Sequence, residues 1–238
     1  MTARQRIQPG GSPCKVALCL LALVLACEPA VAARLAVFAG GLSHQVPVTS
    51  MREARFRAVV PQQYDFSCGA AALATLLQFH YAQTATEDEI VLDMYRSGDR
   101  ERITREGFSL LDMKHYLQKR GFIANGYQVP LDEIARVGVP GIVLLNLDGY
   151  LHFVVLKGLE GNRVLIGDPA RGLAIYPRDD FEAMWNGLFF VIDEVSATAM
   201  ASFNDTRAWN LTPKAPLGQA LDRETLASFS VFLPGIFH

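Results

Sequence analysis

The chain has 238 residues, of which 50% are apolar and 19% are charged, so it can build a hydrophobic core and is not disordered throughout. Its 22 basic and 24 acidic residues give a net charge of -2, which excludes nucleic acid or anionic lipid as a main partner bound through a basic surplus.

The N-terminal segment has the three parts of a secretory signal peptide. Residues 1–15 carry basic residues and no acidic one, an apolar run follows from Val16 to Ala26, and Ala30-Val31-Ala32 forms a small-residue cleavage site. The apolar run is shorter than the roughly 20 residues of a membrane-spanning helix. We therefore expect residues 1–32 to be removed on export, and the mature protein to be periplasmic without an integral membrane span. A buried helix, an uncleaved anchor and a lipoprotein anchored at Cys27 are the alternatives.

The cysteines divide between the expected signal peptide and the mature chain. Cys14, Cys19 and Cys27 lie in the signal peptide, and only Cys68 lies beyond it. The mature chain therefore cannot form an internal disulfide, although exported proteins often pair their cysteines. A lone cysteine in such a protein is either an inert buried residue or a reactive thiol.

The first half of the mature chain is predicted to be largely helical. Residues 33–57 alternate loosely and are expected to form an extended lead-in. The alanine- and leucine-rich stretch Ser67–Tyr81 has a helical period. Thr86 and Glu89 match a capping box, which predicts a second helix to about Tyr95.

Three further segments follow in this region. Residues 96–108 are charged and contain glycine, which indicates a mobile loop. Its charged stretch Asp99–Glu106 is interpreted as solvated surface, with a gate for the substrate as the alternative. Ser109 can cap a third helix that ends at Gly121, and a short helix is expected after Pro130.

The second half of the chain has the period and composition of β-strands. Five segments rich in Val, Ile, Leu and Phe are predicted as strands: Gly141–Leu147, Tyr150–Leu159, Arg163–Gly167, Leu173–Pro177 and Leu188–Glu194. Turns such as Asp148-Gly149 connect them, and a short helix, Phe181–Trp185, is expected before the last. Helices first and an antiparallel sheet second predict one α+β domain over residues 58–195. Residues 196–238 are expected to form a tail that wraps this domain or binds a partner.

Cys68 lies at the first turn of the predicted Ser67–Tyr81 helix. Free backbone N–H groups and the positive end of the helix dipole favour an anion there, and such a position lowers the pKa of a thiol. Gly69 and the alanines that follow it keep the surroundings small enough for a carbonyl carbon to approach. This position favours the reactive-thiol interpretation.

A thiolate nucleophile needs a base that can also protonate the leaving group, and imidazole does both near neutral pH. His152 lies inside a predicted strand, which holds a side chain more rigidly than a loop does. Asp168 ends the next predicted strand, where its carboxylate could orient the imidazole. Taken singly, His152 also fits a hydrogen-bonded core residue, and Asp168-Pro169 fits ordinary turn sequence.

Gln62 lies on the loop that leads into the Cys68 helix. Its amide could donate a hydrogen bond to a developing oxyanion, with the Cys68 backbone N–H as the second donor. Gln63, the next residue, is the alternative candidate for this role. Without a further pattern, a loop glutamine is a solvated surface residue.

Together these residues resemble the bacteriocin-processing peptidase domain, a family of papain-like cysteine peptidases that cleave leader peptides after a double glycine. The resemblance rests on the order Gln62, Cys68-Gly69, His152 and Asp168-Pro169, and it covers about residues 58–195. It implies a papain-like α+β fold with N-terminal helices packed on a C-terminal antiparallel sheet. By this resemblance Cys68 is the nucleophile and His152 the base. Asp168 would then orient His152, and Gln62 would donate to the oxyanion.

Neither a metal nor an organic cofactor is expected, because the histidines are scattered and the HExxH and CxxC patterns do not occur. The export signal distinguishes the chain from family members that are fused to ABC exporters, and it is more similar to stand-alone exported members such as the peptidase of functional-amyloid (Fap-type) secretion. We therefore expect an exported cysteine endopeptidase that acts on a peptide or protein of the cell envelope, with secretion-system proteins as candidate partners. The alternatives are a binding module without catalysis and an acyl transferase or amidase that uses the same triad.

Overall fold

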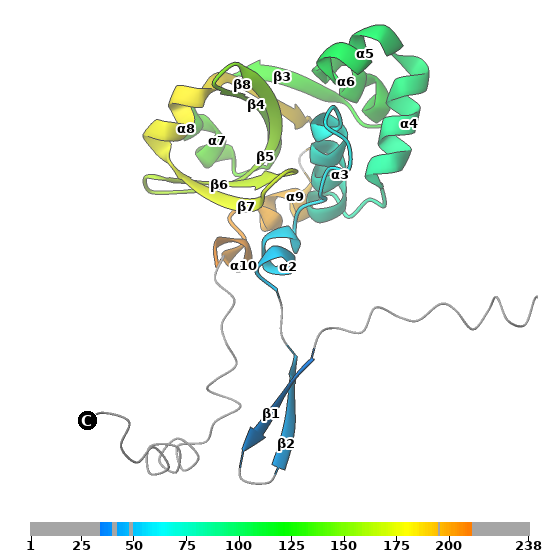
Figure 1. Cartoon of the computed structure of the whole chain (residues 1–238). Helices are drawn as coiled ribbons and strands as arrows, with labels where there is room; N and C mark the ends of the chain where they lie inside the picture. Colours follow the sequence, from blue (N-terminus) through cyan, green and yellow to red (C-terminus); the bar gives the residue numbers. More distant parts are fainter. Residues whose placement is uncertain (1–33, 40–41, 48–49, 195, 211–238) are drawn as a thin grey trace, which may run out of the picture. The chain divides into compact units, whose positions relative to one another are not determined.

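The computed structural model of the chain describes residues 34–39, 42–47, 50–194 and 196–210 (Figure 1). The expected signal peptide, Cys27 and the tail from residue 211 onward lie outside the described residues. The chain divides into two compact units, of which the second comprises Thr49–Ala215 and contains every residue proposed for the site. The first unit contains a hairpin, in which β1 (Arg34–Ala39) pairs antiparallel with β2 (Leu42–Pro47).

The expected lead-in is not extended throughout, because α2 (Met51–Phe56) lies within it. Ser50 and Glu53 form a capping box that satisfies free N–H groups at the start of this helix. Ala54, in the same helix, is buried. The loose alternation of the sequence did not indicate this helix, because six residues are too few to establish a helical period.

The helices predicted around the Cys68 segment are confirmed. They are α3 (Cys68–His80), α4 (Glu87–Ser97), α6 (Leu110–Lys119) and α7 (Leu131–Val137). Thr86 and Ser109 cap α4 and α6, and each forms a capping box with the side chain three residues later. These local signals therefore fix where α4 and α6 begin.

The prediction of a mobile loop over residues 96–108 was wrong, because this segment contains α5 (Arg100–Glu106). The Asp99 side chain accepts a hydrogen bond from the Arg102 backbone N–H and so caps the helix. Ile103 is fully buried, and the Arg102 guanidinium lies 2.6 Å from the Asp112 carboxylate of α6. One apolar anchor and one ion pair were too weak a pattern to recognise in a highly charged stretch.

A six-stranded antiparallel sheet follows, with strand order β3-β8-β4-β5-β6-β7. Its strands are β3 (Ala124–Gln128), β4 (Gly141–Leu147), β5 (Tyr150–Glu160), β6 (Arg163–Asp168), β7 (Gly172–Pro177) and β8 (Trp185–Ile192). The helix before β8 is α8 (Arg178–Met184), so Trp185 belongs to the strand and not to the helix. β3 was not predicted, because its sequence ANGYQ has little strand propensity and its pairing with β8 is a long-range contact.

Helices cover both faces of the sheet, with α3 on one face and α7 and α8 on the other (Figure 1). The buried side chains of β5 alternate between the two sides: Phe153 and Val155 belong to the core around α3, whereas Val154 and Leu156 belong to the core under α7 and α8. The α+β prediction, with helices preceding an antiparallel sheet, is confirmed. This packing places the start of α3 beside the strands that carry the other candidate residues.

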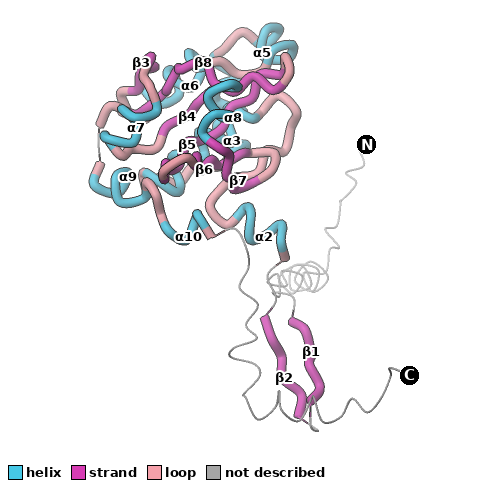
Figure 2. The backbone as a smooth tube through the Cα atoms, turned by 90° about the vertical axis from the view of Figure 1, so that its left-hand side faces the viewer, coloured by secondary structure: helices cyan, strands magenta, loops and turns pink. Residues whose placement is uncertain are grey.

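The first part of the expected tail packs on the domain. α9 (Ala197–Ser202) contacts α3, and α10 (Thr206–Trp209) follows it. Ala208 of α10 shares a small apolar cluster with Val59, Leu165 and Leu173, next to α2 and β7 (Figure 2). Within the described residues, the tail therefore covers the end of the domain.

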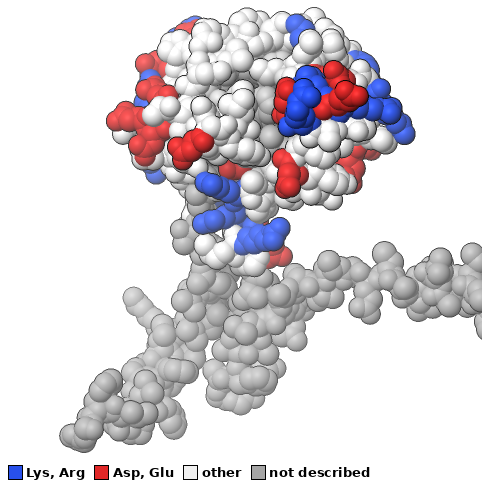
Figure 3. Space-filling model, turned by 45° about the horizontal axis from the view of Figure 1, so that its top comes forward, with Lys and Arg blue, Asp and Glu red and all other residues white. Residues whose placement is uncertain are grey.

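No helix among residues 50–194 and 196–210 combines the length and apolar character needed to cross a membrane. On the face drawn in Figure 3, acidic and basic side chains lie beside one another. This arrangement agrees with the small net charge of the sequence.

Candidate active site

Cys68 is the first residue of α3 and lies beside a cavity of about 970 Å³. Its side chain is largely covered, with 8% of the residue exposed. The Ser67 side chain does not cap the helix, so it leaves the N–H groups of the first turn to other acceptors. Cys68 therefore combines a helix N-terminus, which stabilises a thiolate, with access to a cavity large enough for a peptide segment.

His152 and Asp168 come from adjacent antiparallel strands, β5 and β6. His152 Nε2 lies 2.8 Å from Asp168 Oδ1, and both residues are 3% exposed. Asp168 Oδ1 also accepts the backbone N–H of Ala170 at 2.8 Å. The Asp168 carboxylate therefore contacts the imidazole and also accepts a hydrogen bond in the turn that follows β6.

The environment of the His152–Asp168 pair favours an imidazolium beside a carboxylate. Burial lowers the pKa of His152, but the hydrogen bond with Asp168 and the nearby Cys68 side chain outweigh it and raise this pKa to about 9. Burial raises the pKa of Asp168, but the contact with His152 and two backbone N–H groups hold it below the usual value. Both shifts favour the charged forms of the two groups near neutral pH.

The other imidazole nitrogen is available to the thiol. His152 Nδ1 is buried and has no hydrogen-bond partner within the described part of the chain. Asp168 holds Nε2, so Nδ1 is the nitrogen left to exchange a proton with Cys68 or with a substrate. A thiol at a helix N-terminus, an imidazolium and a carboxylate together form an arrangement capable of nucleophilic acyl transfer.

Tyr150 is a residue of this site that the sequence analysis did not identify. Its ring stacks on His152, with centroids 5.9 Å apart and an interplanar angle of 25°. Its hydroxyl donates to the backbone carbonyl of Asp65 at 3.5 Å, across the cavity beside Cys68. The period of two along β5 puts Tyr150 on the same side as His152, so the spacing could have indicated it.

Gln62, and not Gln63, is tied to the Asp168 turn. The Gln62 backbone N–H donates to the Pro169 carbonyl at 3.0 Å, and its amide Nε2 donates to the Tyr64 carbonyl at 3.2 Å. Gln63 is exposed, and its backbone N–H donates to Glu87. Among the described residues, one N–H of the Gln62 amide has no acceptor and its buried Oε1 has no donor, so the amide can still bond to another group.

Glu87 is the second residue near the site that the sequence analysis missed. It is the first residue of α4 and is only 2% exposed. Its carboxylate accepts the Gln63 backbone N–H at 2.9 Å and the hydroxyl of Ser67. Glu87 therefore fixes both ends of the loop that lies between Gln62 and Cys68.

Replacing Glu87 by alanine is expected to slow alkylation of Cys68 by iodoacetamide about tenfold, since buried donors in the loop lose their acceptor and the loop shifts. Glu87→Gln keeps an acceptor oxygen and should be affected less. The rate is measured by mass spectrometry on the peptide that contains Cys68. Glu89→Ala is the matched control, because it removes the capping box of the same helix without touching the loop. Equal slowing in this control would show that loss of α4 stability causes the effect.

Among residues 50–194 and 196–210 no group of three or more His, Cys, Asp or Glu side chains is arranged to hold a metal ion.

Comparison with known proteins shows that residues 57–196 match the sequence model of the peptidase C39 family. Two relatives are described as probable functional amyloid protease FapD. One, from Pseudomonas fluorescens, is 42% identical over 75% of this chain and 79% of its own length. The other, from Pseudomonas aeruginosa, is 42% identical over 64% of this chain and 67% of its own length.

Among solved structures, the chain is similar to a double glycine motif protease from an AMS/PCAT transporter, determined in complex with its leader peptide. The two share 30% sequence identity with a TM-score of 0.48, over 58% of this chain and 93% of the other.

Proposed function

Because the chain belongs to the peptidase C39 family and is a cysteine peptidase, we propose that it is an exported endopeptidase that cleaves a peptide or protein of the cell envelope. We further propose that its substrate belongs to a secretion or functional-amyloid system. The similarity to the FapD proteases supports the substrate class. The signal-like sequence of residues 1–32 supports export.

The proposed catalytic residues are Cys68, His152 and Asp168, with Gln62 as a donor to the oxyanion. The observation that carries this assignment is the buried His152–Asp168 contact of 2.8 Å, which leaves His152 Nδ1 without a partner within the described residues. An imidazole fixed at one nitrogen and free at the other can serve the thiol as base and then as acid.

In the proposed reaction, the Cys68 thiolate attacks the carbonyl carbon of the scissile peptide bond. The resulting oxyanion accepts hydrogen bonds from the Cys68 backbone N–H and the Gln62 amide. His152 Nδ1 donates its proton to the leaving amine as the C–N bond breaks, which leaves a thioester. Neutral His152 then takes one proton from water, and the hydroxide attacks the thioester and displaces the thiolate, which restores the imidazolium. The product is a carboxylic acid, which loses its own proton to solvent.

The pH dependence of Cys68 labelling tests this assignment. The pKa of His152 is raised to about 9, so the imidazolium that favours a thiolate persists near neutral pH, and labelling near pH 7 should be faster than for a free cysteine. His152→Ala should slow labelling near pH 7. The rate is followed on the peptide that contains Cys68, and Cys68→Ala gives the blank.

Two outcomes would contradict the proposal. Labelling near pH 7 that is no faster than for a free cysteine, or that is unchanged in His152→Ala, would remove the thiolate–imidazolium pair from the mechanism. Either would favour the binding-module alternative. A reactive thiol with no hydrolysis of any peptide would favour acyl transfer to an acceptor other than water.

A further inference from the structure

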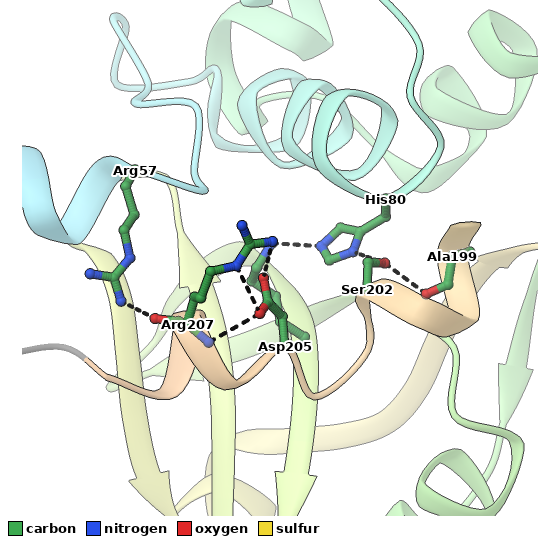
Figure 4. Close-up of polar contacts among 7 residues, drawn as sticks. Arg57, His80, Ala199, Ser202, Asp205 and Arg207 are labelled. Carbon is green, nitrogen blue, oxygen red and sulfur yellow. Dashed lines mark hydrogen bonds and ion pairs between the residues drawn. The ribbon is translucent and has the colours of Figure 1, made fainter. Parts of the chain in front are cut away.

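A second polar cluster lies at the opposite ends of the two elements that carry Cys68 and His152. α3 begins with Cys68 and ends with His80, and β5 carries both His152 and Lys157. Lys157 Nζ lies 2.6 Å from His80 Nε2. The other side of the His80 ring faces Ser202 of α9 (Figure 4). The described mechanism uses neither residue.

The fold places the Lys157 side chain in this cluster through an irregularity of the sheet. The pairing of β5 with β6 shifts register between Leu156 and Gly158, so Lys157 is the additional residue of a β-bulge. Bulges redirect a side chain that a regular strand would point elsewhere. On β6, Gly167 leaves space for the lysine stem, since a Cβ atom there would lie 3.0 Å from Lys157 Cδ.

The hydrogen bonds in the cluster define the protonation of His80. The Lys157 ammonium has no lone pair, so at 2.6 Å it donates to His80 Nε2. The proton of the neutral imidazole then lies on Nδ1, which faces Ser202 Oγ at 2.7 Å, and the Ser202 hydroxyl can donate to the Ala199 carbonyl. Burial and then the charge of Lys157 lower the pKa of His80 to about 2. Ser202 and His80 thus do not form a nucleophile and base.

Lys157 is buried, and N–H groups of its ammonium have no acceptor among the described residues. The residue is only 3% exposed, and among the described residues the His80 nitrogen is the one hydrogen-bond partner of its amine. An ammonium has three N–H donors, so two remain. The Phe79 ring lies over the amine, 5.6 Å from its centroid, and supplies no conventional acceptor. A buried cation with unmet donors is costly unless an anion completes its shell.

The space beside Lys157 is a cavity of about 260 Å³, here called the basic cavity. Arg57 and Arg207, both exposed, line it together with Lys157 and Asp205. Asp205 is engaged by Arg207, whose guanidinium Nε and backbone N–H lie 3.3 and 3.0 Å from its Oδ1. The three cationic side chains outnumber this single acid by two.

We propose that the basic cavity is a binding site for a small divalent tetrahedral oxyanion of the phosphate class. The floor supplies a buried ammonium with two N–H donors that have no acceptor among the described residues. At the mouth, Arg57 Nη2 donates to the backbone carbonyls of Arg207 and Asn210, and Arg207 pairs with Asp205. The remaining N–H groups of the two guanidinium groups suit phosphate oxygens. The surplus of two positive charges matches a divalent anion. The volume of about 260 Å³ accommodates one such ion with water molecules.

Calorimetry with sodium phosphate and sodium sulfate as titrants tests the site on the full chain at constant ionic strength. One ion is expected to bind per chain, and Lys157→Met should weaken binding about tenfold or more, the loss of a charge-assisted hydrogen bond. Burial lowers the pKa of Lys157 to about 7, so at pH 8 sulfate binding should take up a proton, which a comparison of buffers with different ionisation heats measures.

Variants keep this test independent of folding and of peptidase activity. Arg207→Ala should weaken binding several-fold, whereas Arg136→Ala, which removes an exposed and similarly paired guanidinium on α7, should not. Cys68→Ala should bind like the wild type. The proposal would be overturned if phosphate and sulfate gave no binding signal beyond that of sodium chloride. Equal binding by wild type, Lys157→Met and Arg207→Ala would also overturn it.

Discussion

Replacing Cys68 by alanine is expected to abolish peptide hydrolysis, with a loss of about 10⁴-fold or more in turnover, because the only atom that forms the acyl-enzyme is removed. The backbone N–H groups and Gln62 stay in place, but they only stabilise charge on a substrate that no longer acquires it. The measurement uses a peptide library at neutral pH, with cleavage products identified by mass spectrometry. Substrates derived from functional-amyloid subunits form a second arm of the same assay.

The control for Cys68→Ala is a measurement that the variant remains folded. The thiol is largely buried but small, and alanine retains most of its volume. The melting temperature should therefore change little. Retained hydrolysis by a folded Cys68→Ala protein would exclude this cysteine from the mechanism, whatever its reactivity toward iodoacetamide.

The elements that carry the candidate residues were predictable because their signals are local. Alanine and leucine spacing indicated α3, and Thr86 and Ser109 fixed the starts of two later helices. Hydrophobic strands separated by turns indicated β5 and β6, and this adjacency is what brings His152 to Asp168. The order of residue types along the chain then suggested one site.

The parts that sequence reasoning missed depend on contacts between distant segments. β3 exists because β8 pairs with it, although its own residues disfavour a strand. In the sequence, Glu87 has the pattern of an exposed acidic residue in the first turn of a helix. It is buried because the loop before Cys68 packs on it and donates the Gln63 N–H to its carboxylate. The β-bulge that directs Lys157 into the domain cannot be recognised from the hydrophobic pattern of β5. The added residue changes the register of β5 against β6, and this register is defined only by the pairing of the two strands.

Asp168→Asn is expected to reduce hydrolysis by about 10²- to 10⁴-fold while leaving the protein folded. Asparagine retains an oxygen that can accept the Ala170 N–H, so the turn after β6 keeps its hydrogen bond. What is lost is the negative charge that raises the pKa of His152. The imidazole should then deprotonate at lower pH, and the upper limb of the pH–rate profile should move down from about 9.

The stability of this variant separates the two roles of Asp168. The pKa of Asp168 is depressed in the folded protein, so its contribution to the free energy of unfolding is present above the unfolded value of about 3.9 and is lost as the pH falls. The pKa of His152 is raised, so its contribution is complete below about 6.5 and is lost as the pH rises through about 9. Asp168→Asn should flatten both limbs. If Asp168→Asn instead unfolds at neutral pH, the main role of Asp168 is structural. Asp168→Ala gives the comparison, because it removes the acceptor of the turn. The orientation of His152 would then depend on its packing against Tyr150.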